Sequence, residues 1–214
     1  MARSLSTSSL FIVWVKIRPM REKYLTALKK QLDEKIFTHS LALEACMGGL
    51  YDYFQKENLL NENDPPKEDW LLAGLIHDID YSPPFKADHP NKTVEALDLY
   101  GLTISPSVHN IVKAHAPELT GYNPQNKAEW SILCADSLTG LIMAVAYVYP
   151  TRKLGDVKLS SVMKRFLKEP KFAAGTRREE VALCEKPTGL NLPVETFIMI
   201  CLDSMQKIAP SLGL

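Results

Sequence analysis

The sequence predicts an all-α protein, folded as a single-domain bundle of about eight or nine helices. Apolar residues recur at helical spacing through most of the chain, and the alternation typical of strands is almost absent. The 214 residues suit one compact domain that buries about 70% of its unfolded surface. The apolar fraction of 46% and the charged fraction of 23% are those of an ordinary globular protein.

The expected helices follow from these periodicities and from the turn and capping residues between them. They cover, in chain order, residues 24–32, 38–54, 70–79, 89–101, 105–116, 128–149 and 157–166, a segment that begins at the Thr176/Glu179 capping box, and residues 194–208. Residues 117–125 are expected to form a turn-rich loop. No internal repeat or linker interrupts the series.

Residues 1–19 do not share this pattern and are expected to be a disordered N-terminal extension. Residues 20–214 form the expected domain, with a metal-binding core at about 24–149 and C-terminal helices at 150–214. The apolar runs at 10–15 and 141–149 are too short for a convincing signal sequence or membrane span. The four cysteines are well separated and typical of reduced core residues, so we expect a cytoplasmic protein.

Several histidines and aspartates occupy positions on apolar helix faces. His39 lies on one stripe with Leu43, Cys46 and Leu50, while His77 and Asp78 end an otherwise apolar segment. Asp136 follows Ile132 and Leu133 at helical spacing, and His115 similarly follows Val108, Ile111 and Val112. Because a buried carboxylate is costly without a partner, a shared divalent cation is an attractive explanation.

Each of these residues, taken alone, also has an ordinary structural explanation. A histidine on an apolar face is usually a hydrogen-bonded core residue. His89 and Asp78 are also suited to capping, and Asp136 to pairing with a lysine. His109 lies six positions before His115, which rotates it away from the same stripe, so it is excluded as a ligand. The prediction of a metal site therefore depends on convergence of several residues.

The order of these residues resembles that of the HD-domain metal-dependent phosphohydrolases. The matching residues are His39 in THSLALEA, His77-Asp78 in LLAGLIHDID and Asp136 in ILCADSLTGL, and the resemblance covers about Tyr24 to Tyr149. It implies a helical bundle in which these four residues bind one metal ion.

A subset of that superfamily has two further histidines that bind a second ion, with the HD aspartate bridging both. His89 in ADHPNKTVEAL and His115 in IVKAHAPEL stand in the corresponding places. The layout is similar to that of symmetrical diadenosine-tetraphosphate hydrolases, and cyclic-dinucleotide phosphodiesterases use a related arrangement. This chain departs from those groups at Ala116-Pro117-Glu118, where the hydrolases have Thr-Thr-Gly. At Asp80-Tyr81 it lacks both the Gly-Lys pair of the phosphodiesterases and the catalytic Glu of the deoxynucleotide 5′-nucleotidases.

We therefore predict a phosphohydrolase that cleaves a phosphate ester or anhydride, with a nucleotide favoured as substrate, through metal-activated hydroxide. The cofactor is one or two divalent ions, with iron or manganese favoured over zinc, nickel, cobalt and magnesium. The alternatives are a mononuclear nucleotidase or phosphatase and a non-catalytic regulatory module. The expected metal ligands are His39, His77, Asp78, His89, His115 and Asp136.

Asp78, Asp80 and Asp88 are the expected catalytic carboxylates, with Asp80 or Asp88 assisting proton transfer. Substrate phosphate is assigned to Lys113, two residues before His115, and to Arg152 and Lys153 in a local basic stretch. A solvated helix face explains that basic stretch equally well. The net charge of zero gives no global field for nucleic acid or an anionic membrane. The expected partner is therefore a small phosphorylated substrate, with neither nucleic acid nor a membrane. A homodimer is an open alternative to a monomer.

Overall fold

Helices make up the regular structure of residues 20–214, the part of the chain that the computed structural model describes, and no strand occurs in that range. This confirms the predicted all-α class, whereas the predicted extension at residues 1–19 lies outside the described residues. A first helix covers residues 20–31. The remaining elements are α2 (Glu34–Lys56), α3 (Lys67–Ile76), η1 (Lys86–Asp88), α4 (Thr93–Asp98), α5 (Pro106–Ala114), α6 (Pro117–Thr120), α7 (Lys127–Val148), η2 (Leu154–Asp156), α8 (Leu159–Lys168), α9 (Arg178–Val181), η3 (Ala182–Glu185), α10 (Val194–Lys207) and η4 (Ala209–Leu212).

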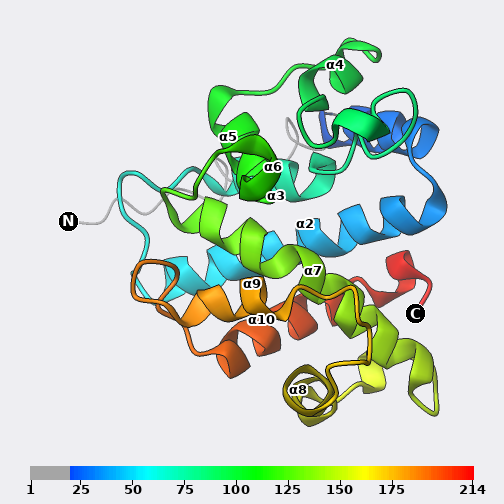
Figure 1. The fold of residues 1–214 in the computed structure, drawn as a ribbon, viewed down its shortest axis with the longest axis vertical. Coiled ribbons are helices and arrows are strands. Elements are labelled where there is room, and N and C mark those ends of the chain that lie inside the picture. The colour runs from blue at the N-terminus through cyan, green and yellow to red at the C-terminus, as the bar shows by residue number, and fades with distance from the viewer. Residues whose placement is uncertain (1–19) are drawn as a thin grey trace, which may run out of the picture.

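The long helix α2 lies at the centre of the bundle and packs against α3, α7 and α10 (Figure 1). It begins at Glu34, earlier than predicted, because the Asp33 side chain accepts hydrogen bonds from the backbone N–H groups of Lys35 and Ile36. Its apolar stripe, which includes Leu43 and Leu50, has no solvent exposure. Burial of this stripe fixes which face of α2 points to the core.

Helix α7 crosses the bundle beside α2 and supplies much of the buried surface. It is long and apolar enough to cross a membrane by length and composition, but 67% of its most apolar window is buried inside the protein. A core helix has that same property. The Asn126 side chain caps its start by accepting from the Glu129 N–H at 3.1 Å.

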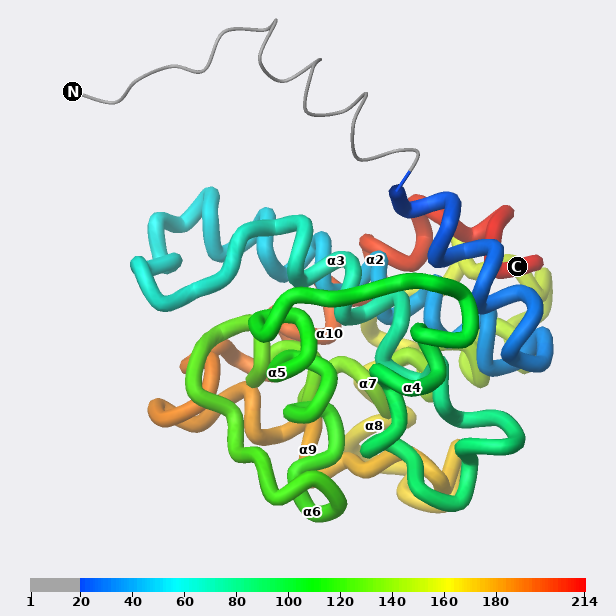
Figure 2. Tube along the Cα trace, turned by 90° about the horizontal axis from the view of Figure 1, so that it is seen from above, coloured from blue at the N-terminus to red at the C-terminus, as the bar shows by residue number. Residues whose placement is uncertain are grey.

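The first helix and the C-terminal turn η4 flank α2 (Figure 1 and Figure 2), and Arg21, Leu25 and Ser211 line a groove together with residues of α2. The buried apolar residues of the described chain, from Tyr24 to Leu212, form one cluster. The C-terminal helices therefore share a core with the segment that carries the predicted metal ligands.

Two local expectations were wrong. Thr176 does not cap a helix, because α9 begins at Arg178 and has no side-chain cap. Residues 117–125 are not entirely loop, since Pro117–Thr120 make one helical turn that ends at Gly121 with φ of 69°. Proline at the first turn and glycine in the left-handed region favour this short helix.

Gly74 lets α3 approach α2 closely. A β-carbon at this position would lie 3.0 Å from the backbone atoms Cα of Glu44 and O of Leu43. Helix α3 would have to move away from α2, and its C-terminal end carries His77. The absence of a side chain at Gly74 therefore helps to set the distance between residues from the two helices.

We predict that Gly74→Ala destabilises the protein by about 1–3 kcal/mol through overpacking, although alanine normally favours a helix. Gly140 of α7 is the matched control, because a β-carbon there would meet nothing within 4 Å. Gly140→Ala should stabilise the helix by about 0.5–1 kcal/mol. Urea denaturation of both variants measures the two effects, and stabilisation by Gly74→Ala would contradict this account of the α2–α3 contact.

Candidate metal centre

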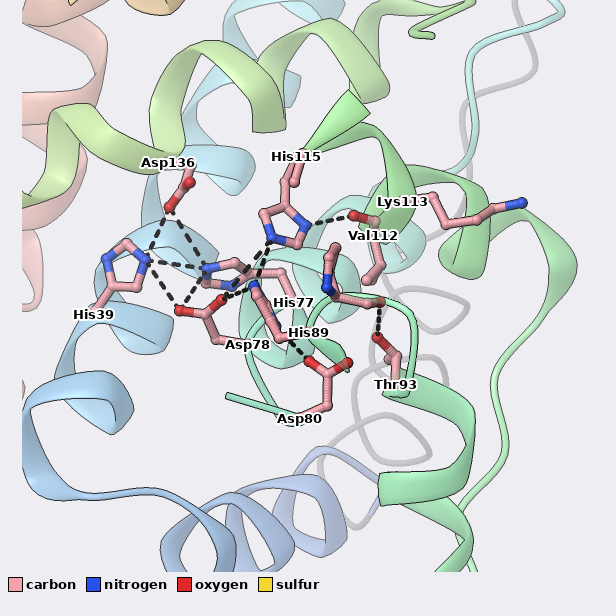
Figure 3. A network of polar contacts seen from close by, with 12 residues as sticks. His39, His77, Asp78, Asp80, His89, Thr93, Val112, Lys113, His115 and Asp136 are labelled. Atoms are coloured by element: carbon pink, nitrogen blue, oxygen red, sulfur yellow. Dashed lines mark hydrogen bonds and ion pairs between the residues drawn. The ribbon is translucent and has the colours of Figure 1, made fainter. Parts of the chain in front are cut away.

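Six sequence-predicted ligands meet where α2, α3, α5 and α7 approach one another (Figure 3). Helix α2 carries His39 and α7 carries Asp136. The remaining four come from the ends of elements or from loops: His77, Asp78, His89 and His115. Residues separated by nearly a hundred positions thus share one small volume.

The first half of the cluster joins His39, His77, Asp78 and Asp136. His39 Nε2 lies 3.0 Å from His77 Nε2 and 2.9 Å from Asp136 Oδ1. Asp78 Oδ2 lies 3.4 Å from His77 Nε2 and 3.7 Å from His39 Nε2. Two imidazole nitrogens and two carboxylate oxygens therefore face a common point.

The second half joins the other oxygen of Asp78 to His89 and His115. Asp78 Oδ1 lies 3.4 Å from His89 Nε2 and 3.9 Å from His115 Nε2. These two nitrogens are 3.4 Å apart. Each Asp78 oxygen faces a different histidine pair, so this carboxylate could contribute to both halves. Both triads that include Asp78 are compact enough to hold an ion.

Outer hydrogen bonds determine the tautomers of His77 and His115. Nδ1 of His77 lies 3.0 Å from the Gly74 carbonyl oxygen, and Nδ1 of His115 lies 2.5 Å from that of Val112. A carbonyl oxygen only accepts, so each Nδ1 carries the proton and donates it. In the neutral rings, Nε2 then presents a lone pair to the cluster.

Side chains orient the other two rings in the same way. The Thr139 hydroxyl donates to the Asp136 carbonyl at 2.8 Å, so its oxygen accepts from His39 Nδ1 at 2.8 Å. The Asp80 carboxylate accepts from His89 Nδ1 at 2.6 Å and from the Lys92 backbone N–H at 2.8 Å. Histidine ligands of protein-bound metals have such outer partners in nearly every case.

When neutral, all four imidazoles therefore turn an accepting nitrogen toward two acceptor carboxylates. Nothing in the neutral arrangement supplies a proton between His39 Nε2 and His77 Nε2. A cation would satisfy all of these lone pairs, and imidazole with carboxylate is a ligand set suited to iron, manganese or zinc. The chemistry of the donor set fits one or two metal ions.

The pKa values show how strongly the cluster attracts positive charge. Burial alone would lower the pKa of His77, but Asp78 and Asp136 outweigh it and raise the pKa to about 10. His77 and His39 in turn hold the pKa values of both carboxyl groups below their usual range, against the opposing effect of burial. Burial, with a smaller contribution from His77, lowers the pKa of His115 to about 4.

The cluster forms the floor of a cleft of about 550 Å³. Ile36, Tyr81 and Leu119 supply apolar and aromatic surface, and residues 173–177 supply another wall. Tyr81 stands edge-on to the His89 ring, with centroids 4.9 Å apart. The cleft is large enough for a small organic molecule.

The three lysine and arginine residues assigned to substrate phosphate do not line this cleft. Lys113 points away from the cluster (Figure 3), with Nζ 4.6 Å from the Tyr122 ring centroid. Arg152 and Lys153 are exposed in the turn after α7. We therefore do not assign these residues to the site.

The two carboxylates predicted to assist proton transfer, Asp80 and Asp88, lie in different surroundings. Asp80 has no solvent exposure, and both of its oxygens accept hydrogen bonds. Its contacts are those of a residue that positions His89. Asp88 is exposed in η1 and does not line the cleft.

Sequence reasoning missed two residues that contact the cluster, Thr139 and Arg177. Thr139 follows Asp136 by one helical turn, so the spacing on α7 was a usable signal. Arg177 Nη2 donates to Asp136 Oδ2 at 2.8 Å from a segment 41 positions away. No pattern in the sequence indicated that contact.

Comparisons of the chain with protein-family models, curated proteins and solved structures gave no match. The helical fold and the His/Asp cluster are compatible with an HD-type domain.

The metal-free protein should lose stability as the pH rises above about 6.5, which is the unperturbed pKa of a histidine side chain. With its pKa raised to about 10, folded His77 retains a proton that the unfolded chain releases. The stabilisation is fully present below the unfolded pKa and disappears as pH rises through about 10. The slope is at most about 1.4 kcal/mol per pH unit, and His115 titrates below this window.

Urea denaturation with a chelator present, at about pH 6.5, 8 and 9.5, measures this slope. A saturating divalent ion should flatten it, because the ion takes the place of the proton. Metal-free stability that stays constant or rises across this range would contradict the expected charge balance of the cluster.

Asp80→Asn should weaken the metal affinity of the His89-containing half by about 10–100-fold. An asparagine has one accepting oxygen, whereas Asp80 accepts from two donors. Competition with a chromophoric chelator measures both affinities. Asp88→Asn is the control, because Asp88 is exposed and outside the cleft. Equal affinities for both variants would show that Asp80 does not position His89.

Proposed function

We propose that this protein is a phosphohydrolase that uses two divalent metal ions. The observation that carries the proposal is the convergence of four Nε2 lone pairs and two carboxylates, arranged as two halves around Asp78. Such an arrangement fits two neighbouring ions better than a buried protein-only network, since a protein-only network needs donors as well as acceptors.

His39, His77 and Asp136 would hold the first ion and His89 and His115 the second, with Asp78 shared between them. Bound ions would activate water as the nucleophile and neutralise charge on the phosphate oxygens. The protein contributes rigid orientation, because the outer partners of the histidine rings fix each tautomer. Orientation of this kind reduces the reorganisation needed during reaction.

The composition of the cleft also supports a phosphorylated substrate. Its floor is the polar cluster, and Arg177 places a permanent positive charge on one wall. Tyr81 and Leu119 offer apolar surface at the rim, where a nucleoside or similar organic group can pack. A nucleotide matches this combination of an anionic and an aromatic part.

The test combines metal analysis with a panel of nucleoside phosphates, cyclic dinucleotides, dinucleoside polyphosphates and simple monoesters, assayed with manganese, iron and other ions. We expect about two ions per chain and hydrolysis of at least one phosphorylated class. One ion per chain would favour a mononuclear phosphatase. Two ions with no hydrolysis across the panel would favour a regulatory module.

Asp78→Asn should reduce hydrolysis by about a thousandfold or more and lower the ion content, because the bridging carboxylate is replaced by a neutral amide. Circular dichroism checks that the variant is folded. His109→Asn is the matched control, since His109 lies on α5 but outside the cluster. Near-normal turnover by a metal-depleted Asp78→Asn protein would refute the proposal.

A further inference from the structure

Arg177 is the one lysine or arginine among the described residues that line the cleft. Its Nη2 donates to Asp136 Oδ2 at 2.8 Å and its Nε donates to Glu180 Oε2 at 2.5 Å. Its side chain nevertheless remains 44% exposed. A partly exposed guanidinium next to the predicted ions is well placed to meet an anionic ligand.

The hydrogen-bonding capacity of Arg177 is only partly used. A guanidinium has five N–H bonds, and within residues 20–214 it makes only the two hydrogen bonds to Asp136 and Glu180. The remaining N–H bonds are available to a ligand in the cleft. Arginine favours phosphate because its planar fork pairs with two phosphate oxygens at once.

The neighbouring Arg178 holds this wall of the cleft in place. Its Nε donates to the Phe166 carbonyl at 3.1 Å, and its Nη2 donates to the Phe172 carbonyl at 2.6 Å, with longer bonds to the carbonyls of Arg165 and Glu169. These bonds attach the segment to the C-terminal end of α8. Arg177 is thereby presented to the cleft from a fixed backbone, which reduces the entropy lost on binding.

The position of Arg177 relative to the cluster suggests which part of a substrate it contacts. Asp136 turns Oδ1 toward His39 and His77, and Oδ2 toward Arg177. An anion that pairs with Arg177 therefore lies beside Asp136 Oδ2, at the opposite edge of that carboxylate from His39 and His77. A diphosphate can place one phosphoryl group above the predicted ions and the next one at Arg177.

We infer that Arg177 binds the phosphoryl group next to the reacting one, so that phosphoanhydrides are preferred over simple monoesters. This inference rests on the proposed function. In the hydrolysis, an oxygen of water forms a bond to phosphorus as the bridging P–O bond breaks. The leaving phosphate takes the bonding electron pair, and the water proton passes to solvent. Arg177 would stabilise the negative charge that develops on the leaving group.

A purely structural role for Arg177 makes a different prediction. If it only orients Asp136, its removal weakens metal binding and affects all anions to the same degree. If it binds a second phosphoryl group, its removal selectively affects ligands that carry one. The comparison therefore needs two anions that differ in that group alone, measured on protein with confirmed ion content.

The experiment titrates methylphosphonate and methylenediphosphonate into manganese-loaded protein by calorimetry. Neither compound has a P–O–P bond to hydrolyse, so the result does not depend on catalysis. Wild-type protein should bind the diphosphonate more tightly. Arg177→Gln should weaken diphosphonate binding by about 10–100-fold and change methylphosphonate binding by no more than about threefold. Arg177→Lys should recover part of the loss, because lysine keeps the charge without the planar fork.

Lys171→Gln is the matched control, because Lys171 is exposed in the same segment but does not line the cleft. It should bind both compounds within about twofold of wild type. Equal loss of both ligands in Arg177→Gln, loss of manganese from that variant, or a wild type without preference for the diphosphonate would each overturn the inference. A protein that shows the preference but hydrolyses no substrate would contradict only the proposed activity.

Discussion

The contact between His39 Nε2 and His77 Nε2, 3.0 Å apart, is the constraint on which the candidate site depends. Both rings donate through Nδ1 to acceptors outside the cluster, so both would point lone pairs at each other if neutral. Asp78 and Asp136 add negative charge at the same point. A positive charge must therefore be present, either as a proton on His77 or as a bound cation.

The fold maintains this costly arrangement through ordinary packing. Helix α2 is buried against three other helices, and Gly74 allows α3 to lie close to it. The backbone carbonyls of Gly74 and Val112, from the last turns of α3 and α5, then accept from the histidines that follow. Because helix ends leave carbonyl groups without intrahelical partners, they suit this role. The C-terminal ends of α3 and α5 therefore also orient two of the predicted metal ligands, His77 and His115.

Much of this arrangement was predictable from the sequence. The apolar stripes of α2 and α7 indicated which faces are buried, and therefore that His39 and Asp136 point inward. The early start of α2 was harder, since Asp33 lies beyond the apolar pattern that located the helix. Periodicity also gave no information on Lys113, because its direction depends on the contact with Tyr122 in a later loop.

The contacts between residues far apart in the sequence could not be predicted from the sequence alone. Asp80 was recognised as a carboxylate near the site, but its burial and its bonds to His89 and Lys92 depend on how the loop folds back. Arg177 belongs to a polar segment, and its contact with Asp136 depends on the Arg178 anchor to α8. Sequence pattern indicates which helix faces are buried, whereas tertiary packing decides which exposed charges reach the cleft.

Anomalous diffraction from crystals grown with manganese tests the central claim most directly. The account predicts two peaks about 3.5–4 Å apart, with Asp78 between them, His39, His77 and Asp136 around one, and His89 and His115 around the other. The absence of any manganese peak in this cluster from crystals grown in excess manganese, with the His39 and His77 rings still in contact, would contradict it.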